Sequence, residues 1–418
     1  MTASRARRDG SVTDNSSPPA ASGGVTRFAG SATPEGTARF RERATRVHRL
    51  PASHFRIAPG NLIVSSLGLG TYIGAADRVT DVSVEHAVQV SLASGRVNVL
   101  DTAINYRHQR AERCIGRSLV GTFARGVAAR DEVFVATKHG YISPDSEGPV
   151  PVDQYLELEL IGKGILGAGD VVDGSHAMSV GYLNDQFERS RTNLGLETID
   201  LVYLHNAADA QLPEVGHDEF FSRLEAAFRL YERLRMEGHL GAYGIATWDA
   251  LRTPRSHPAH LSLEETVNLA RSVGGPDHGF RFVQFPFNLL MPEAATQTNQ
   301  SVNGERATLF EAVRRLGLGS FTSVPLLQGQ LARNGPVAPA LTAAQTAIQF
   351  ARSVGGNLAA LIGQKRTEHL SENLRVAELT PWDADRCRQF LPNAPSTLGR
   401  SRSNGWDGLE PTPEPRAS

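Results

Sequence analysis

Three short segments carry the clearest strand pattern: residues 97–106 read VNVLDTAINY, residues 133–138 read VFVATK and residues 199–205 read IDLVYLH. Each stretch contains a short apolar run of strand type that leads into ionisable or hydroxyl-bearing residues. Short apolar strands separated by longer amphipathic segments are typical of parallel βα repetition. Because the carboxyl ends of parallel barrel strands meet on one face, we expect these polar residues to converge there.

Along the chain, eight apolar segments alternate with helical ones, and eight alternations favour a closed (β/α)8 TIM barrel over an open doubly wound sheet. Ahead of the first strand, two apolar runs flank Pro59-Gly60-Asn61, which predicts an N-terminal β-hairpin that could plug the bottom of the barrel. The predicted strands are 66–70, 97–101, 133–137, 199–204, 241–246, 280–284, 320–323 and 358–363. The predicted helices include 84–93, 183–194, 220–237, 263–273, 308–316, 342–354 and 367–379.

The two ends of the chain differ in composition from the barrel. Residues 1–49 are rich in Ser, Gly, Pro, Ala and Arg with little apolar periodicity, which predicts a disordered N-terminal arm. The barrel is expected over 50–393, and the similar composition of 394–418 predicts a disordered C-terminal tail. Residues from about 142 to 178 do not fit the alternation and are predicted to be a loop inserted after the third strand.

Charge and composition exclude several classes of protein. The 43 Lys and Arg residues nearly balance the 44 Asp and Glu residues, so no overall field recruits nucleic acid or an anionic membrane. The N-terminus lacks the apolar segment of a secretory signal, and no run of 18 apolar residues occurs. Cys114 and Cys387 lie far apart in a domain that needs no disulfide, so reduced thiols in a cytoplasmic protein are expected.

Four residues carry the expected chemistry. Asp101, Lys138 and His205 end the second, third and fourth strands, and Tyr106 follows Asp101 closely enough to fold back over the same rim. A phenol has a pKa near 10, so its proton is donated more readily beside a cation that stabilises the phenolate, and Lys138 supplies that charge. Asp101 would keep the lysine charged, and His205 would hydrogen-bond the substrate oxygen. This set suits carbonyl reduction.

The chain resembles the aldo/keto reductase superfamily from about Phe55 to Leu379, in order, spacing and strand placement. The resemblance implies an NADP-dependent oxidoreductase that transfers a hydride between C4 of the nicotinamide and an aldehyde, a ketone or the corresponding alcohol. It makes Tyr106 the proton donor, gives Lys138 and Asp101 the tuning role, lets His205 orient the carbonyl, and makes a monomer the default. The runs that carry it are LGLGTY (67–72), NVLDTAINYRHQRAERCIG (98–116), ATKHG (136–140), LGLETIDLVYLHN (194–206), GIATW (244–248) and LIGQKRTEHLSEN (361–373).

The resemblance carries over unevenly at the nicotinamide. Thr71 and Tyr72 match positions beside the nicotinamide, and Gln284 matches the residue that bonds its carboxamide. The family's Ser-Asn pair after the fifth strand is here Ala246-Thr247, so only Thr247 can bond through its side chain. The aromatic residue usually stacked on the nicotinamide is replaced by Ser323. The family's grip on the nicotinamide is therefore expected to be altered.

The phosphate end follows the family more closely. The run Gly363-Gln364-Lys365-Arg366 ends the last strand, and two cations near a helix N-terminus suit the adenosine 2′-phosphate. This favours NADPH/NADP+ over NAD. By the same resemblance Gly363 lies in the cofactor site, and Glu372 and Asn373 bond the adenine.

Several other motifs and functions compete with this interpretation. His108, His139, His176 and Cys114 form no spacing typical of a metal site, so no metal is expected. Residues 162–167 match GxGxxG, but no helix pattern follows. A cofactor-binding regulatory barrel with little turnover, or a lyase that forms a Schiff base through Lys138, remain as alternatives. The sequence leaves the small-molecule substrate and the direction open; the expected substrate walls are 143–178, 206–219 and 288–306.

Overall fold

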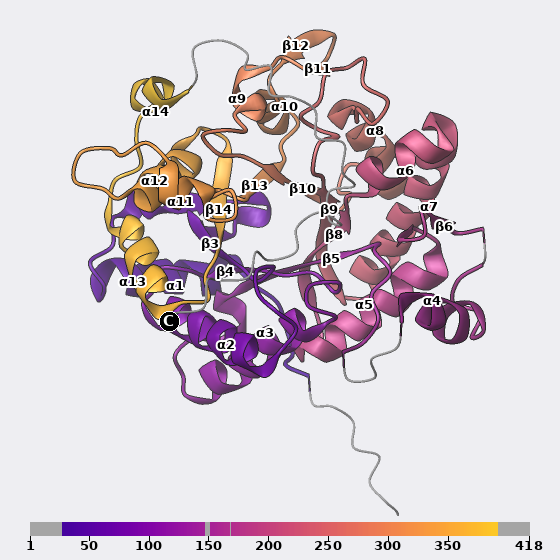
Figure 1. Ribbon diagram of the computed structural model, residues 1–418, viewed down its shortest axis with the longest axis horizontal. Coiled ribbons are helices and arrows are strands. Elements are labelled where there is room, and N and C mark those ends of the chain that lie inside the picture. The colour runs from indigo at the N-terminus through magenta and orange to yellow at the C-terminus, as the bar shows by residue number, and fades with distance from the viewer. Residues whose placement is uncertain (1–26, 147–150, 168, 392–418) are drawn as a thin grey trace, which may run out of the picture.

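A computed structural model describes residues 27–146, 151–167 and 169–391, so the predicted tail at 394–418 lies outside the described residues. Eight parallel strands close into a barrel in the order β10-β13-β14-β3-β4-β5-β8-β9 and occupy the centre of Figure 1. The predicted (β/α)8 barrel is therefore confirmed. The strands are β3 (Leu67–Gly70), β4 (Val99–Asp101), β5 (Phe134–His139), β8 (Ile199–His205), β9 (Leu240–Ala246), β10 (Phe280–Pro286), β13 (Gly319–Ser323) and β14 (Asn357–Gly363).

Helices surround the strands and cover their outer faces (Figure 1). The seven predicted helices all form, although the last, expected to reach residue 379, ends at Leu374 and continues as the 3-10 turn η5 (Arg375–Glu378). The surrounding helices are α2 (Arg78–Ala93), α3 (Arg110–Ala124), α5 (Val180–Leu194), α7 (His217–Met236), α8 (Leu263–Gly274), α10 (Leu309–Arg315), α12 (Ala343–Ser353) and α13 (Thr367–Leu374).

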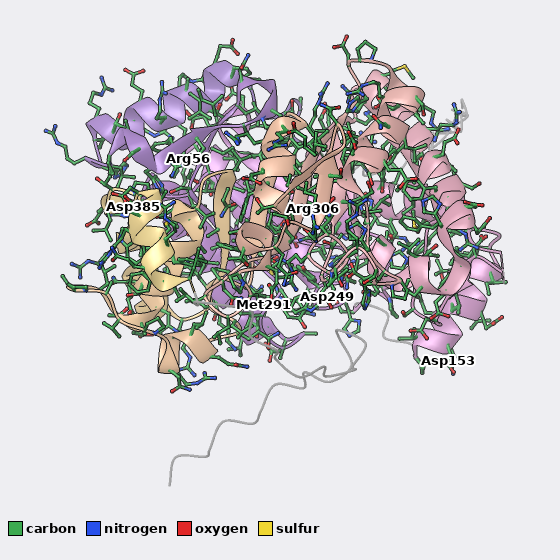
Figure 2. All side chains as sticks on the ribbon, turned by 90° about the horizontal axis from the view of Figure 1, so that it is seen from above. Arg56, Asp153, Asp249, Met291, Arg306 and Asp385 are labelled. Atoms are coloured by element: carbon green, nitrogen blue, oxygen red, sulfur yellow. The ribbon has the colours of Figure 1, made fainter. Side chains whose placement is uncertain are left out.

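The predicted hairpin closes one end of the barrel. β1 (Phe55–Ile57) pairs antiparallel with β2 (Ile63–Ser65) across the turn η2 (Pro59–Asn61), in which Gly60 adopts φ 76°. Ala58 and Val64 pack with the residues that fill the barrel interior. In Figure 2, Arg56 of β1 lies on the opposite side of the molecule from Asp249 and Met291, which follow β9 and β10. The hairpin therefore covers the bottom, and the carboxyl ends of the strands open on the other face.

The expectation that disorder extends from residue 1 to residue 49 is wrong for the described part of that segment. α1 (Pro34–Arg46) packs against η3 (Arg130–Glu132), and Phe40 is 1% exposed. The helix is capped by the Thr33 hydroxyl, which accepts a hydrogen bond from the Gly36 backbone N–H. The physical reason lies in tertiary packing. The helix has one apolar face and is polar elsewhere, and that face is buried only when the folded barrel provides a surface against which it packs.

The insertion after β5 lies where the sequence predicts it, but the prediction of a plain loop is wrong. It contains α4 (Val152–Gln154), the π-helical turn η4 (Tyr155–Ile161) and the antiparallel pair β6 (Val171–Val172) and β7 (His176–Ala177). A small apolar cluster holds it to α5, formed by Tyr155, Leu160, Leu166, Ala177 and Tyr182.

The remaining elements are short connections around the barrel. They are η1 (Ala52–His54), α6 (Ala207–Val215), α9 (Glu293–Thr296), β11 (Gln300–Val302), β12 (Glu305–Ala307), α11 (Gln330–Asn334) and α14 (Ala384–Phe390).

None of the helices in the described ranges combines the length and apolar character needed to span a membrane.

Candidate active site

The alternation of side chains along the strands brings three of the predicted residues together. Interior residues of β4, β5 and β8 include Val99, Ala136 and Tyr203. Successive side chains of a strand point to opposite faces, so the residue two positions further on lies on the same face. That residue is Asp101 in β4, Lys138 in β5 and His205 in β8, and all three are at most 5% exposed. The three side chains therefore meet at the upper end of the barrel interior.

Asp101 and Lys138 form a buried ion pair. The Lys138 Nζ donates to Asp101 Oδ1 at 2.6 Å and to the carbonyl oxygen of Thr102 at 2.7 Å. Gln284 donates from Nε2 to the other carboxylate oxygen of Asp101 at 2.8 Å. Burial raises the pKa of Asp101 and lowers the pKa of Lys138, and the attraction between the two charges opposes both shifts. The lysine is thus held in one position by two oxygen acceptors, and the Asp101 carboxylate is held in turn by Gln284.

Tyr106 reaches the same place through a tight turn. Three consecutive residues after it, Arg107, His108 and Gln109, have φ of 51°, 52° and 70°, a left-handed run that turns the chain before α3 begins. The Tyr106 ring lies with its centroid 4.9 Å from Lys138 Nζ and is 8% exposed. Burial raises the pKa of Tyr106 well above its usual value, and the charge of Asp101 adds to this. The phenol is therefore protonated at neutral pH.

His205 faces Tyr106 across the site. The two ring centroids are 5.7 Å apart with planes at 75°. Burial and the nearby Lys138 charge hold the pKa of His205 well below its usual range, so the ring is neutral. A second phenol ring, Tyr141, lies 5.1 Å from His205 at 89°. No sequence pattern singles out Tyr141, because its contact with His205 depends on the course of the chain after β5.

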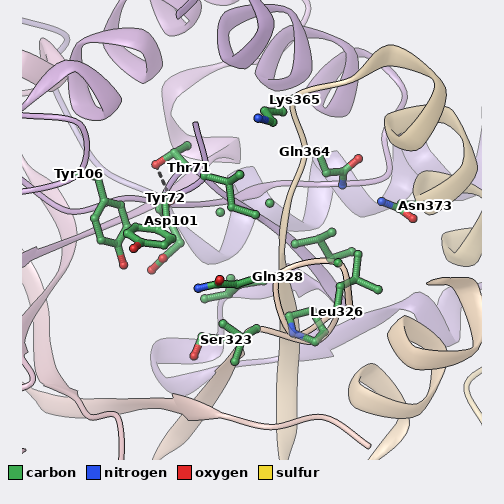
Figure 3. Close-up of a pocket in the computed structure, with 18 of the residues that line it drawn as sticks. Thr71, Tyr72, Asp101, Tyr106, Ser323, Leu326, Gln328, Gln364, Lys365 and Asn373 are labelled. Carbon is green, nitrogen blue, oxygen red and sulfur yellow. Dashed lines mark hydrogen bonds between the residues drawn. The ribbon is translucent and has the colours of Figure 1, made fainter. Parts of the chain in front are cut away.

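A pocket of about 520 Å³ opens above these groups. Figure 3 shows Tyr106, Tyr72 and Asp101 at one end of the pocket and Lys365, Gln364 and Asn373 toward the other. Lys138 is not part of the wall and lies beneath it. All other residues predicted for the site line the pocket: Thr71, Tyr72, Asp101, Tyr106, His205, Thr247, Gln284, Gly363, Lys365, Arg366, Glu372 and Asn373.

One wall of the pocket comes from a segment that the sequence did not single out, residues 323–333 from the end of β13. Of the segments predicted to form the substrate walls, only Asn206 lines this pocket among the described residues. In the segment 323–333, Val324, Leu327 and Gln328 adopt φ of 49°, 44° and 51°. A sequence without glycine at these positions gives no signal of such a turn.

Several predicted contacts are already occupied by protein groups. Thr71 donates its hydroxyl to the carbonyl oxygen of Asp101 at 3.1 Å (Figure 3). Glu372 accepts a hydrogen bond from the Thr342 hydroxyl of the neighbouring α12. The amide nitrogen of Gln284, expected at the nicotinamide carboxamide, is bonded to Asp101. These three residues hold the walls of the pocket in place.

Other polar atoms of the pocket have no hydrogen-bond partner within the described part of the chain. They are the hydroxyl of Thr247, both heteroatoms of the Gln364 amide and the amide oxygen of Asn373, on side chains no more than 4% exposed. A buried polar group without a partner costs about 1–3 kcal/mol. These atoms therefore fit a polar ligand that supplies both donors and acceptors along the pocket.

Two competing motifs gain no support from the geometry. No cluster of three or more His, Cys, Asp or Glu side chains suited to a metal occurs among the residues described. The described residues of the GxGxxG run, 162–167, do not line the pocket and lead into a short strand rather than a helix.

Comparison with known proteins places this geometry in context. Residues 66–263 match the model of the aldo/keto reductase family. The fold is similar to that of an aldo-keto reductase from Bacillus halodurans in its holo form, with TM-score 0.55 and 17% identity over 81% of this chain and 97% of that chain. It is also similar to an aldo/keto reductase from Klebsiella pneumoniae in complex with NADP and acetate, with TM-score 0.54 and 16% identity over 83% and 99%. No curated protein matches the chain.

Proposed function

We propose that the chain, whose residues 66–263 match the aldo/keto reductase family model, is an NADP-dependent oxidoreductase of that family acting on an aldehyde or ketone, or on the corresponding alcohol. The observation that carries the proposal is the meeting of Tyr106, His205 and the Lys138–Asp101 pair at one end of a pocket whose other end is cationic and rich in unpaired amide atoms.

The residues of the pocket fit a nicotinamide dinucleotide. Lys365 and Arg366 lie beside the N-terminus of α13, where side-chain charge and backbone N–H groups together suit a 2′-phosphate. The unpaired amide atoms of Gln364 and Asn373 would bond the adenosine portion, and Thr247 the nicotinamide portion. NADPH is therefore the proposed cofactor, and when bound it supplies the hydride at C4 of the nicotinamide.

The four residues of the site then divide the work of reduction. Neutral His205 donates a hydrogen bond to the carbonyl oxygen and so orients it. Negative charge develops on that oxygen during hydride transfer, and Tyr106 gives it the phenolic proton. Lys138 stabilises the phenolate that remains, and Asp101 holds Lys138 protonated and in position. In the reverse direction the phenolate takes the proton of an alcohol.

A Schiff-base function for Lys138 is disfavoured by its bonding. Its ammonium donates to Asp101 and to a backbone carbonyl oxygen, and it is 1% exposed beneath the pocket wall. An amine that attacks a carbonyl must be neutral and exposed to substrate, and neither condition holds. Treatment with borohydride and an aldehyde should leave Lys138 unmodified.

A cofactor-binding regulatory barrel is the second candidate, and one observation favours it. Ala246 and Ser323 line the pocket where the family carries a hydroxyl residue and an aromatic one, so two groups that would hold the nicotinamide are missing. Single-turnover oxidation of bound NADPH by a panel of aldehydes separates the two functions, because a regulatory barrel would bind the cofactor without oxidising it.

The test of the proposal is Tyr106→Phe with a matched control. Tyr231 is a fully buried tyrosine of α7, away from the pocket, so Tyr231→Phe removes a phenol without touching the site. Tyr106→Phe should lower aldehyde turnover roughly 10²- to 10⁴-fold and leave quenching of NADPH fluorescence intact. Tyr231→Phe should turn over like the wild type. Absence of NADPH binding by the wild type would refute the proposal.

A further inference from the structure

One residue of the insertion contacts the catalytic strand end directly. His176, the first residue of β7, is completely buried, and its Nε2 lies 2.9 Å from the backbone carbonyl oxygen of His205. Its Nδ1 lies 2.9 Å from the amide Nε2 of Gln211 in α6. The insertion is thus joined by one side chain both to the end of β8 and to the helix that follows it.

This contact replaces a missing strand partner. β5 pairs with β8 only as far as His139 opposite Leu204, one position short of His205. The next backbone N–H after β5, that of Gly140, is not available to His205 because it donates to Gln186 Oε1 at 2.8 Å. A buried carbonyl at the rim needs a donor from elsewhere, and His176 supplies it.

Arg223, Gln211 and His176 form a series of hydrogen bonds that ends at the His205 carbonyl oxygen, and their donor and acceptor types fix the direction of each bond. Arg223 can only donate, and its guanidinium lies 3.2 Å from Gln211 Oε1, so the Gln211 amide nitrogen faces His176. That nitrogen also can only donate, so His176 Nδ1 accepts. The proton of the ring is therefore on Nε2, which donates to the His205 carbonyl oxygen. Burial lowers the pKa of His176 to about 4, in keeping with this neutral form.

The packing around His176 leaves no room for adjustment. A Cβ added at Gly140, whose φ is 131°, would lie 2.4 Å from His176 Nε2. The Tyr141 ring packs perpendicular to both histidines, at 5.1 Å from each ring centroid. The backbone N–H of Ala177 donates to the Gly140 carbonyl oxygen at 2.9 Å, which ties β7 to the end of β5.

We infer that His176 is a positioning residue for the reaction: through the His205 carbonyl it fixes the peptide from which the His205 ring projects beside Tyr106, and the insertion that carries it is a brace behind the active site rather than a lid over it. The inference rests on the proposed function for its kinetic consequence. It also has a consequence in the free protein, because the ring of His205 keeps one orientation only while its carbonyl is bonded.

Two matched substitutions separate the two bonds of His176. His176→Gln places an amide N–H near the position of Nε2 and keeps a donor for the His205 carbonyl. His176→Asn, similar in polarity, reaches only as far as Nδ1, so it keeps an acceptor for Gln211 and loses the bond to His205. His176→Leu loses both bonds. A role confined to holding the insertion in place would not distinguish Gln from Asn in this way.

The experiment measures kcat, KM, NADPH affinity and thermal stability of the three variants. We expect His176→Gln to stay within a few-fold of the wild-type kcat, and His176→Asn and His176→Leu to lose roughly 10- to 100-fold, the usual consequence of a misplaced catalytic group, with NADPH affinity unchanged. Equal kcat in the Gln and Asn variants, or a loss confined to thermal stability, would overturn the inference.

A measurement without substrate keeps the test independent of the proposed function. The ring ¹⁵N and ¹H signals of His205, assigned with a His205→Gln variant, should match the wild type in His176→Gln and shift or broaden in His176→Asn. If the wild type lacks turnover but these signals behave as expected, the proposed function fails and the positioning role stands. Unchanged signals in all variants would refute the positioning role, even with an active wild type.

Discussion

Asp209, in the first turn of α6, controls the loop after β9, and its replacement by asparagine offers a quantitative test. Oδ1 of Asp209 accepts the backbone N–H groups of Asp249 at 2.7 Å and Ala250 at 2.9 Å, and Oδ2 accepts that of Trp248 at 3.0 Å. Trp248 and the preceding Thr247 line the pocket. One carboxylate thus sets the position of a segment that the proposed function assigns to cofactor binding.

The expected loss follows from which oxygen is replaced. In Asp209→Asn the Oδ1 acceptor is retained, and the new NH2 group faces the N–H of Trp248, so one hydrogen bond becomes a contact between two donors. An unsatisfied backbone donor of this kind costs about 1–3 kcal/mol in free energy of unfolding at pH 7. Because Thr247 and Trp248 lose their anchor, the Kd for NADPH should rise several-fold. Urea unfolding and NADPH fluorescence titration measure the two effects.

The pH dependence of the stability difference between the wild type and Asp209→Asn provides a second test, because the pKa shift of Asp209 fixes its sign. Burial raises the pKa of Asp209 from 3.8 to about 6. The folded protein therefore binds this proton before the unfolded chain does, and the contribution of Asp209 to stability rises as the pH falls from about 6 to about 4. Asparagine does not titrate, so the wild type should gain about 2 kcal/mol relative to Asp209→Asn between pH 7 and pH 4, allowing for partial exposure. A constant or narrowing difference, or an equal effect of Asp249→Asn on the neighbouring exposed carboxylate, would contradict this account.

Three further substitutions test other parts of the structure. Lys138→Met removes the cation beside Tyr106 and should lower aldehyde turnover roughly 10²-fold or more with NADPH affinity retained; near-normal turnover would exclude the phenolate-stabilising role. Lys365→Ala should weaken NADPH binding roughly tenfold and leave NADH binding unchanged, measured by fluorescence titration; equal losses for both cofactors would contradict a 2′-phosphate contact. Phe40→Ala should cost about 3–5 kcal/mol in urea unfolding, because α1 buries this ring completely; a change below about 1 kcal/mol would show that α1 is not part of the folded core.

The barrel strands were predictable because their signal is local. Runs such as FVA in β5 and LVYL in β8 are apolar, as strands buried on both faces must be. α1 was not predictable, because only Phe40 and Ala44 mark its buried face within a segment of polar composition. Its burial against η3 depends on the folded barrel, and the apolar residues of the segment do not show a helical periodicity clear enough to predict it.

The residues of the site also differ in whether they could be predicted from the sequence. The meeting of Asp101, Lys138 and His205 could be predicted because each lies at the end of a parallel barrel strand, and the carboxyl ends of such strands meet on one face. The wall formed by 323–333 could not, because its left-handed residues include Val324, a β-branched residue that rarely adopts φ of 49°. The role of His176 could not be predicted either. It depends on a contact with the backbone carbonyl of His205, and every residue has such a carbonyl, so no residue type marks the contact in the sequence.

The hydrogen bond between Gln284 and Asp101 joins two residues that were expected to have separate roles. The sequence assigned Gln284 to the nicotinamide and Asp101 to the lysine, as if the two were separate, but the amide nitrogen of Gln284 donates to the carboxylate and lowers the pKa of Asp101 against the effect of burial. A lower pKa keeps Asp101 ionised, and an ionised Asp101 keeps Lys138 protonated beside the Tyr106 ring. The Gln284 amide thus joins β10, which the resemblance assigns to the nicotinamide, directly to the ion pair beside Tyr106.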